Sequence, residues 1–119
     1  MLLGAAGLAL LGALAHSYLG ERYILIRLFR RDALPKLFGG TEFTKQTLRF
    51  AWHLTSIAWL GFAAILVQLG SNPSRTDLGL VVAVTFGVSG VVSLLGSRGR
   101  HLSWVVFLAA AALAWLGSR

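Results

Sequence analysis

Cysteine is absent from this sequence and acidic residues are scarce, and both shortages narrow its chemistry. Without cysteine the chain can form no disulfide, can offer no thiolate to a metal and has no thiol nucleophile. A metal would therefore have to be held by histidine and carboxylate side chains. With only four carboxylates, hydrolysis at a two-metal site is not expected. The four acids are Glu21, Asp32, Glu42 and Asp77.

Sequence motifs that bind nucleotides or zinc are also missing. No glycine-rich loop runs into a Lys-Ser or Lys-Thr pair, no helix carries His-Glu-x-x-His, and "GTEFTKQ" is typical of a turn followed by a helix start. No residue stands out as a nucleophile. An enzyme acting on lipid, with a histidine base beside Glu21, is therefore the function that we favour least, and we expect a non-enzymatic protein.

Apolar residues dominate the chain. Hydrophobic residues make up 56% of it and charged residues 13%, and the mean hydropathy is +0.74. This balance lies far from that of soluble domains and predicts an integral membrane protein. The net charge of +7 does not predict nucleic-acid binding, because the cations flank apolar runs and form no patch interleaved with stacking aromatic residues.

Four apolar runs are long enough, with some tilt or a flanking turn, to cross about 30 Å of hydrocarbon. They must be helical, because the bilayer offers no hydrogen-bond partner to a free backbone group. We therefore predict an all-α fold, an integral membrane four-helix bundle that forms a single domain over residues 1–119. The predicted spans are about 2–20, 45–69, 78–96 and 102–117.

The first apolar run resembles a signal peptide at one point, where Ala13-Leu14-Ala15 has the small residues of a cleavage site. A signal peptide, however, begins with a positively charged stretch, and no Lys or Arg precedes this run. We expect the segment to be retained as the first span.

Basic residues gather around two of the three connections between spans. By the positive-inside rule, these two connections face the cytoplasm and both termini face away from it. The expected location is an inner membrane of the bacterial type. Arg22, Arg27, Arg30, Arg31, Lys36 and Lys45 lie between the first and second spans, Arg98 and Arg100 lie between the third and fourth, and the remaining connection holds only Arg75.

The segment "ERYILIRLFRR" follows the first span with apolar residues between its cations and with no helix breaker before Pro35. For residues 21–32 we predict a short amphipathic helix at the cytoplasmic surface, or an extension of the first span beyond it. Pro35 and Gly39-Gly40 then break the chain, and Thr41 can cap the next helix.

Small residues form a ridge on one face of the third predicted span. Their spacing of four, four and three keeps them on that face, where another helix can approach closely. The partner is either another helix of the same chain or a helix of another subunit, and the sequence leaves both open. The ridge consists of Gly79, Ala83, Gly87 and Gly90.

His16 lies within the first span, between small residues at Gly12 and Gly20 on the same helix face. This face is suited to close approach of another helix, so His16 is expected to point inward. The two glycines would also leave space for a flat macrocycle against this helix.

The second span carries one polar stripe, which holds Arg49, His53 and Ser56. Because the connection between the first two spans is expected to be cytoplasmic, these spans run antiparallel, and His16 and His53 come to similar depths. Glu21 lies at the same level and is a natural partner for Arg49 or for a histidine. We therefore predict an inward-facing polar cluster near the cytoplasmic leaflet.

Each polar or aromatic residue here also has a plainer explanation. Arg49 can be an interfacial cation that helps to set topology. His16 and His53 can be packed, hydrogen-bonded residues, and His101, in "SRGRHLS", suits an interfacial cap. The tryptophans suit interfacial belts, although Trp52 and Trp59 share a helix face and could border a flat ligand.

Three classes of function follow. In the first, which we favour, the protein is a membrane subunit in which His16 and His53 bind haem b, another metal or a chlorophyll-type pigment between antiparallel helices, as in electron transfer. In the second it is a structural or assembly subunit without its own cofactor. In the third it is a small oligomeric transporter or channel lined by Glu21, Arg49 and His53. The expected partners are the lipid bilayer and either other membrane subunits or further copies of the chain, and not nucleic acid.

Overall fold

The structure, a computed structural model, describes residues 1–31 and 33–119, and its regular structure in these ranges is helical. The predicted all-α fold of four main helices is confirmed, and three of them are long and apolar enough to span a membrane. Asp32, at the end of the predicted 21–32 segment, lies outside the described residues. The helices are α1 (Leu2–Leu19), which continues through a π-helical segment (Gly20–Leu25) into α2 (Ile26–Leu28), then α3 (Glu42–Leu69), α4 (Arg75–Gly96) and α5 (Ser103–Gly117).

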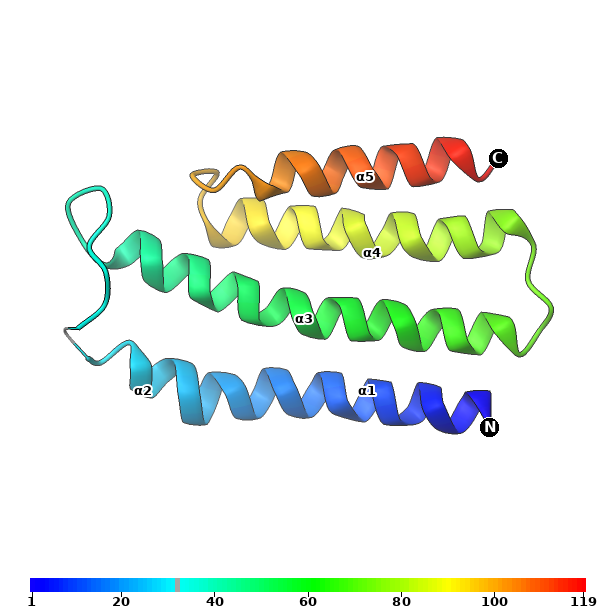
Figure 1. Ribbon diagram of the computed structural model, residues 1–119, viewed down its shortest axis with the longest axis horizontal. Helices are drawn as coiled ribbons and strands as arrows, with labels where there is room; N and C mark the ends of the chain where they lie inside the picture. The colour runs from blue at the N-terminus through cyan, green and yellow to red at the C-terminus, as the bar shows by residue number, and fades with distance from the viewer. Residues whose placement is uncertain (32) are drawn as a thin grey trace.

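The four long helices lie side by side in chain order, so the bundle is one helix thick (Figure 1). The layer measures 51 × 31 × 14 Å. Within the described ranges α1 packs on α3, α3 on α4 and α4 on α5, and α1 contacts neither α4 nor α5. An open layer of this kind suits a bilayer, because lipid tails are as apolar as leucine and there is little to gain by enclosing a core.

The two ends of the layer differ in charge. One end, the basic end, holds the connections at residues 29–41 and 97–102, and the other holds both chain termini and the connection at residues 70–74 (Figure 1). Nine of the eleven Lys and Arg residues of the sequence fall at or next to the basic end.

The first helix extends to Leu28 without a break, as expected for the extension rather than for a separate surface helix. The extension begins with one π-helical segment, Gly20–Leu25, which contains Glu21. An insertion of this kind changes the direction in which side chains project and is often found at functional sites.

The connection from α2 to α3 turns at Leu37–Gly40, where Phe38 and Gly39 adopt positive φ angles of 53° and 86°. Thr41 occupies the N-cap position of α3 as predicted, but its side chain makes no capping hydrogen bond. Thr44 instead donates its hydroxyl hydrogen to the carbonyl of Pro35 at 2.8 Å, which ties the connection to the first turn of the helix.

The start of α4 is fixed by a capping box. The Ser74 hydroxyl accepts from the Asp77 amide at 3.1 Å, and the Asp77 carboxylate accepts from the Ser74 amide at 2.9 Å. The helix therefore begins at Arg75, earlier than the predicted span. Arg75 and Thr76 donate to the carbonyls of Gly117 and Ser118, so the start of α4 also satisfies the end of α5.

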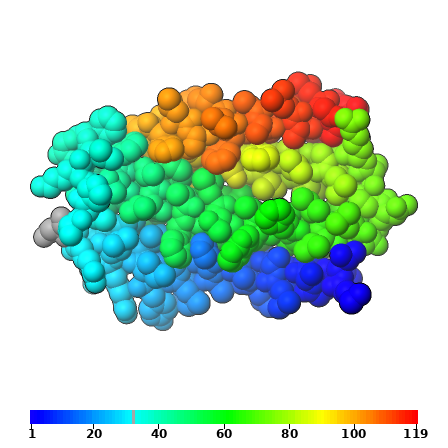
Figure 2. All heavy atoms as spheres, in the orientation of Figure 1, coloured from blue at the N-terminus to red at the C-terminus, as the bar shows by residue number. Residues whose placement is uncertain are grey.

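Helix lengths separate α5 from the others. The continuous first helix, α3 and α4 have 27, 28 and 22 residues and are long and apolar enough to cross a membrane. With 15 residues, α5 is about 22 Å long, shorter than the roughly 30 Å hydrocarbon core. Many large apolar side chains are exposed on the layer, among them Leu8 and Leu113, and Figure 2 shows one broad face.

The small-residue ridge of α4 faces α5. A Cβ atom at Gly90 would lie 2.7 Å from the Leu108 side chain, and one at Gly87 would lie 3.9 Å from Ala111. At Gly79 it would overlap Ser118, and Ala83 is buried. The ridge thus packs within the chain, which is the first of the two alternatives that the sequence left open.

Candidate functional site

The predicted polar residues of α1 and α3 meet at the basic-end half of the seam between these two helices. Glu21 lies at its outer edge. Its Oε1 is 2.9 Å from Arg49 Nη2, and its Oε2 accepts from Arg49 Nε at 3.2 Å. His53 Nε2 lies 3.4 Å from the same Oε2. Glu21 therefore joins a guanidinium to an imidazole, and both are partly exposed.

Two serine hydroxyls link His53 to His16, which lies further from the basic end. His53 Nδ1 is 2.9 Å from Ser17 Oγ, which hydrogen-bonds Ser56 Oγ at 2.8 Å. Ser56 Oγ in turn lies 3.0 Å from His16 Nδ1. The hydrogen bonds thus run unbroken from Glu21 to His16, and we call the five residues Glu21, His53, Ser17, Ser56 and His16 the polar chain.

Helical spacing brings these residues together. On α3, Arg49, His53 and Ser56 follow one another at intervals of four and three and so share a face. Ser17 and Glu21 are four apart across the junction with the π-helical segment. Because α1 and α3 are antiparallel (Figure 1), Ser17 and Glu21 of one stripe both reach residues of the other.

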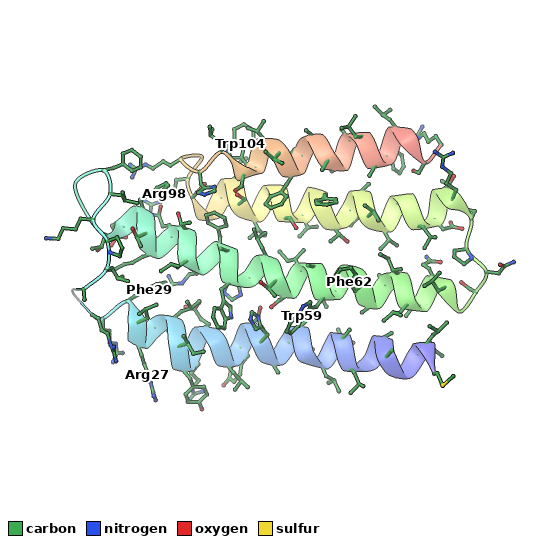
Figure 3. All side chains as sticks on the ribbon, in the orientation of Figure 1. Arg27, Phe29, Trp59, Phe62, Arg98 and Trp104 are labelled. Carbon is green, nitrogen blue, oxygen red and sulfur yellow. The ribbon has the colours of Figure 1, made fainter. Side chains whose placement is uncertain are left out.

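Two tryptophans of α3 enclose His16. The Trp52 ring stacks on the imidazole with a centroid separation of 4.5 Å, and its Nε1 donates to the His16 carbonyl at 3.0 Å. Trp59 lies against the same imidazole at 5.1 Å, between α1 and α3 (Figure 3). Both indoles therefore belong to the seam, and for Trp52 this contact replaces the predicted place in an interfacial belt.

The glycines of α1 make room for these indoles. A Cβ atom at Gly20 would overlap Trp52, and one at Gly12 would lie 3.6 Å from Trp59. The expectation that Gly12 and Gly20 leave space for a macrocycle is therefore wrong, because tryptophan side chains fill that space.

The polar chain can hold its hydrogens in two orders, because each hydroxyl can donate in either direction. In one order His16 Nδ1–H donates to Ser56, Ser56 to Ser17 and Ser17 to His53 Nδ1, while His53 Nε2–H donates to Glu21. Both imidazoles are then neutral and every contact has a donor and an acceptor. In the other order His16 has gained a proton on Nε2, each hydrogen of the polar chain has moved one step, and His53 is the imidazolium beside Glu21.

The chain offers few ligands to a metal ion. No group of three His, Cys, Asp or Glu side chains that could hold one occurs among residues 1–31 and 33–119. The Nδ1 atoms of His16 and His53 are both hydrogen-bonded to serine hydroxyls, and His53 Nε2 faces Glu21. Of the ring nitrogens of these two histidines, the Nε2 atom of His16 is the one without a hydrogen-bond partner in the part of the chain that the structure describes.

A separate small cluster surrounds His101 at the start of α5. Its Nδ1 accepts from the Ser103 amide at 3.3 Å and lies 2.9 Å from the Ser103 hydroxyl, and its ring packs edge-on against Phe50 at 5.3 Å. His101 therefore accepts from the first amide of α5, although the N-cap position itself is Leu102. Ser103 also hydrogen-bonds Ser93 of α4.

Sequence reasoning missed Ser17 and the inward position of Trp52. Ser17 carried a usable signal, since it lies four residues before Glu21 on the same helix surface. The Trp52 contact had no such signal, because the indole reaches His16 only through the gap that Gly20 leaves on another helix.

Long apolar helices whose outer faces carry exposed apolar side chains make this a small integral membrane protein. Residues 49–106 match a family of membrane domains described as a domain of unknown function (DUF202). The match covers just under half of the chain, from Arg49 in α3 through α4 to the first turn of α5. Comparison with curated proteins and with solved structures gave no match.

Proposed function

We propose that this membrane protein is a non-enzymatic subunit that relays a proton between the membrane interior at His16 and the basic end at Glu21. The observation that carries the proposal is the unbroken hydrogen-bonded chain between two imidazoles and a carboxylate. Imidazole is the side chain that most readily gains and loses a proton between about pH 5 and pH 8. Ionisable residues in membrane spans often mark proton relays.

The two orders of the polar chain define the relay step. A proton binds His16 Nε2, and the Nδ1 hydrogen passes to Ser56. Ser56 passes its own hydrogen to Ser17, and Ser17 passes its hydrogen to His53 Nδ1. His53 then holds the extra proton beside the Glu21 carboxylate, which stabilises the imidazolium. Release from His53 Nε2 to water leaves the hydrogen of His16 on Nε2 and that of His53 on Nδ1. The first order returns when both imidazoles change back to their first tautomers and the two hydroxyls rotate.

The relay needs a proton donor or acceptor at His16, because the polar chain ends there. His16 and Glu21 are five residues apart, so the chain covers only about 8 Å along the helix axis. The helix that carries His16 is at the edge of the layer, with α3 as its only packed neighbour among the described residues. A further membrane subunit, or a second copy of the chain, can therefore reach it.

Titration of the histidines tests the relay directly. In protein labelled with ¹⁵N-histidine and reconstituted in lipid, we expect the Nδ1 signals of His16 and His53 to change together as the pH is varied. Ser17→Ala should uncouple the pair, whereas Ser89→Ala, which removes a buried serine that bonds its own helix, should not. If the wild-type imidazoles titrate independently, or if Ser17→Ala changes stability without changing the titration, the polar chain is structural.

A second candidate keeps His16 as an axial ligand for haem b or a chlorophyll-type pigment. Two observations favour it. The Nε2 atom of His16 has no hydrogen-bond partner among the described residues, and two flat indoles lie against this imidazole. The filled spaces at Gly12 and Gly20 argue against a macrocycle between α1 and α3, so the group would have to bind at the outer edge of the layer.

The visible absorption spectrum separates the two candidates. Mildly purified protein, oxidised and then reduced, should show a haem- or pigment-like band that His16→Ala abolishes if His16 is a ligand. A featureless spectrum would rule out this candidate for the purified protein and leave the titration result unaffected.

We also infer that the basic end faces the cytoplasm, because it holds most of the cations. The absence of cysteine makes this easy to test. A membrane-impermeant maleimide should label Ser71→Cys in intact cells and Lys36→Cys only in inverted vesicles. The reverse labelling pattern would contradict the inferred orientation and the expected direction of the relay.

A further inference from the structure

At the basic end a cavity of about 670 Å³ opens between α3, α4 and the residue that follows α2. Its lining joins two chemical characters. Lys45, Arg49 and Arg98 supply three cations against the one carboxylate of Glu42. Apolar surface comes from Phe29, Phe50 and Leu95. Figure 3 places Phe29 and Arg98 at this end of the layer. A site with a cationic part and an apolar part suits an amphipathic anion.

The charge available to such an anion comes mainly from Lys45 and Arg98. Arg49 already pairs with Glu21 at 2.9 Å. Lys45 lies 3.6 Å from Glu42, which is largely exposed, so that pair is loose. Arg98 is exposed and takes part in no salt bridge among residues 1–31 and 33–119.

A second, apolar cavity of about 310 Å³ lies further along the same seam. On α3 the first cavity is lined at positions 45, 49 and 53 and the second at 57, 60 and 64. These intervals of three and four keep all six positions on one helix face. On α4 the corresponding positions are 95, 92, 88, 84 and 81, again on one face. The two cavities are therefore successive parts of one groove.

The geometry points to an anionic phospholipid as the ligand of this groove. We propose that the phosphate of the headgroup binds between Lys45 and Arg98 and that one acyl chain lies in the apolar cavity between α3 and α4. Basic pockets between membrane helices are a known way to recognise anionic headgroups. A free phosphate would use the cations alone, whereas the apolar continuation of the groove gives a lipid an additional contact.

The residues that test this lipid site take no part in the proposed proton relay. Lys45 and Arg98 take no part in the polar chain, so replacing them leaves the hydrogen bonds from Glu21 to His16 in place. If a variant of Lys45 or Arg98 loses lipid selectivity but keeps the histidine titration of the wild type, the result bears on the lipid site and leaves the proton relay untouched.

The test is native mass spectrometry of the protein released from nanodiscs made of equal parts phosphatidylglycerol and phosphatidylcholine. We expect the wild type to retain phosphatidylglycerol in preference to phosphatidylcholine. Lys45→Gln and Arg98→Gln should each lower that preference about five-fold, the effect of one cation near a membrane surface. Arg27→Gln removes the same charge from the opposite edge of the basic end and should leave the preference within about two-fold (Figure 3).

The acyl-chain contact has its own pair of variants. Val84→Trp places a large ring in the apolar cavity and should reduce phosphatidylglycerol retention without a change in charge. Val106→Trp, on an exposed position of α5 outside both cavities, is the matched control. Circular dichroism establishes that each variant is folded.

Three results would overturn the proposal. The first is equal retention of the two lipids by the wild type. The second is a loss of preference in Arg27→Gln as large as that in Lys45→Gln. The third is displacement of phosphatidylglycerol by millimolar inorganic phosphate together with an unchanged Val84→Trp variant, which would identify a site for free phosphate rather than for a lipid.

Discussion

The seam between α1 and α3 and the seam between α4 and α5 hold antiparallel helices together in different ways. The first seam is fastened by hydrogen bonds between polar side chains of the two helices, from Glu21 to His16. The second depends on close approach at Gly79, Ala83 and Gly90. Its side-chain hydrogen bonds lie at its two ends, between Ser93 and Ser103 near the basic end and from Arg75 and Thr76 to the last carbonyls of α5.

Away from Arg75 at its end, the α4–α5 seam packs without an ionisable residue among the described contacts of the two helices. In the middle of α4 the hydroxyls bond within their own helix, with Thr85 donating to the Val81 carbonyl and Ser89 to the Thr85 carbonyl. Two histidines and a glutamate in the α1–α3 seam exceed what helix association requires. This excess is the reason to look for function there.

The largest expected effect breaks the α1–α3 seam. In Gly20→Ala the new Cβ atom would overlap the Trp52 indole, which is itself held by stacking on His16. We expect a loss of about 3 kcal/mol in the free energy of unfolding, the upper range for overpacking. Titration with SDS, followed by circular dichroism, measures it. A loss below that of Gly90→Ala would mean that the indole moves aside freely.

A smaller effect is expected at the α4–α5 seam. In Gly90→Ala the Cβ atom would lie 2.7 Å from Cδ2 of Leu108, which can rotate away, and 3.3 Å from its backbone nitrogen, where α5 must give slightly. We expect a loss of about 1 kcal/mol, because the strain is offset in part by the better helix propensity of alanine. The same SDS titration applies, and a stabilised variant would contradict the close packing of this ridge.

The hydrogen bond between the two serines should contribute less. A double-mutant cycle of Ser17→Ala and Ser56→Ala should give a coupling free energy of about 0.6 kcal/mol, the usual size for a polar contact between membrane helices. The cycle of Ser17→Ala with Ser89→Ala should give none, because Ser89 bonds its own helix. Equal couplings in the two cycles would remove the distinction between the seams.

The smallest effect has the opposite sign. In Gly87→Ala the Cβ atom would meet Ala111 at 3.9 Å, an ordinary van der Waals distance. We expect unfolding to become harder by about 0.5 kcal/mol, because alanine is the better helix former and nothing must move. Destabilisation here, measured as for Gly90→Ala, would mean that the two helices approach more closely at this point.

Much of the fold follows from patterns that are local in sequence. The four helices, the connections at Pro35 and Gly39-Gly40 and the packing face of α4 are set by hydropathy, by breakers and by helical spacing. The start of α4 was less well predicted, because a capping box between Ser74 and Asp77 adds a turn to the apolar run.

The candidate site could be predicted from the sequence only in part. The polar stripe of α3 and the position of Glu21 led to the contacts between Glu21, Arg49 and His53. The link from His53 to His16 could not be predicted from the sequence. It runs through Ser17, whose role depends on the rotation of α1 relative to α3.

The sequence by itself determined that this chain is a helical membrane protein, where its helices lie and which end carries the charge. These properties depend on the composition of single segments and on the cost of placing free backbone groups or charges in hydrocarbon. Only the tertiary structure decided that the helices form a single layer, that indoles fill the spaces at Gly12 and Gly20 and that two serines connect two histidines. In lipid the pairing of helices is not driven by apolar burial, so it depends on the fit of particular side chains from separate helices, which no single segment specifies.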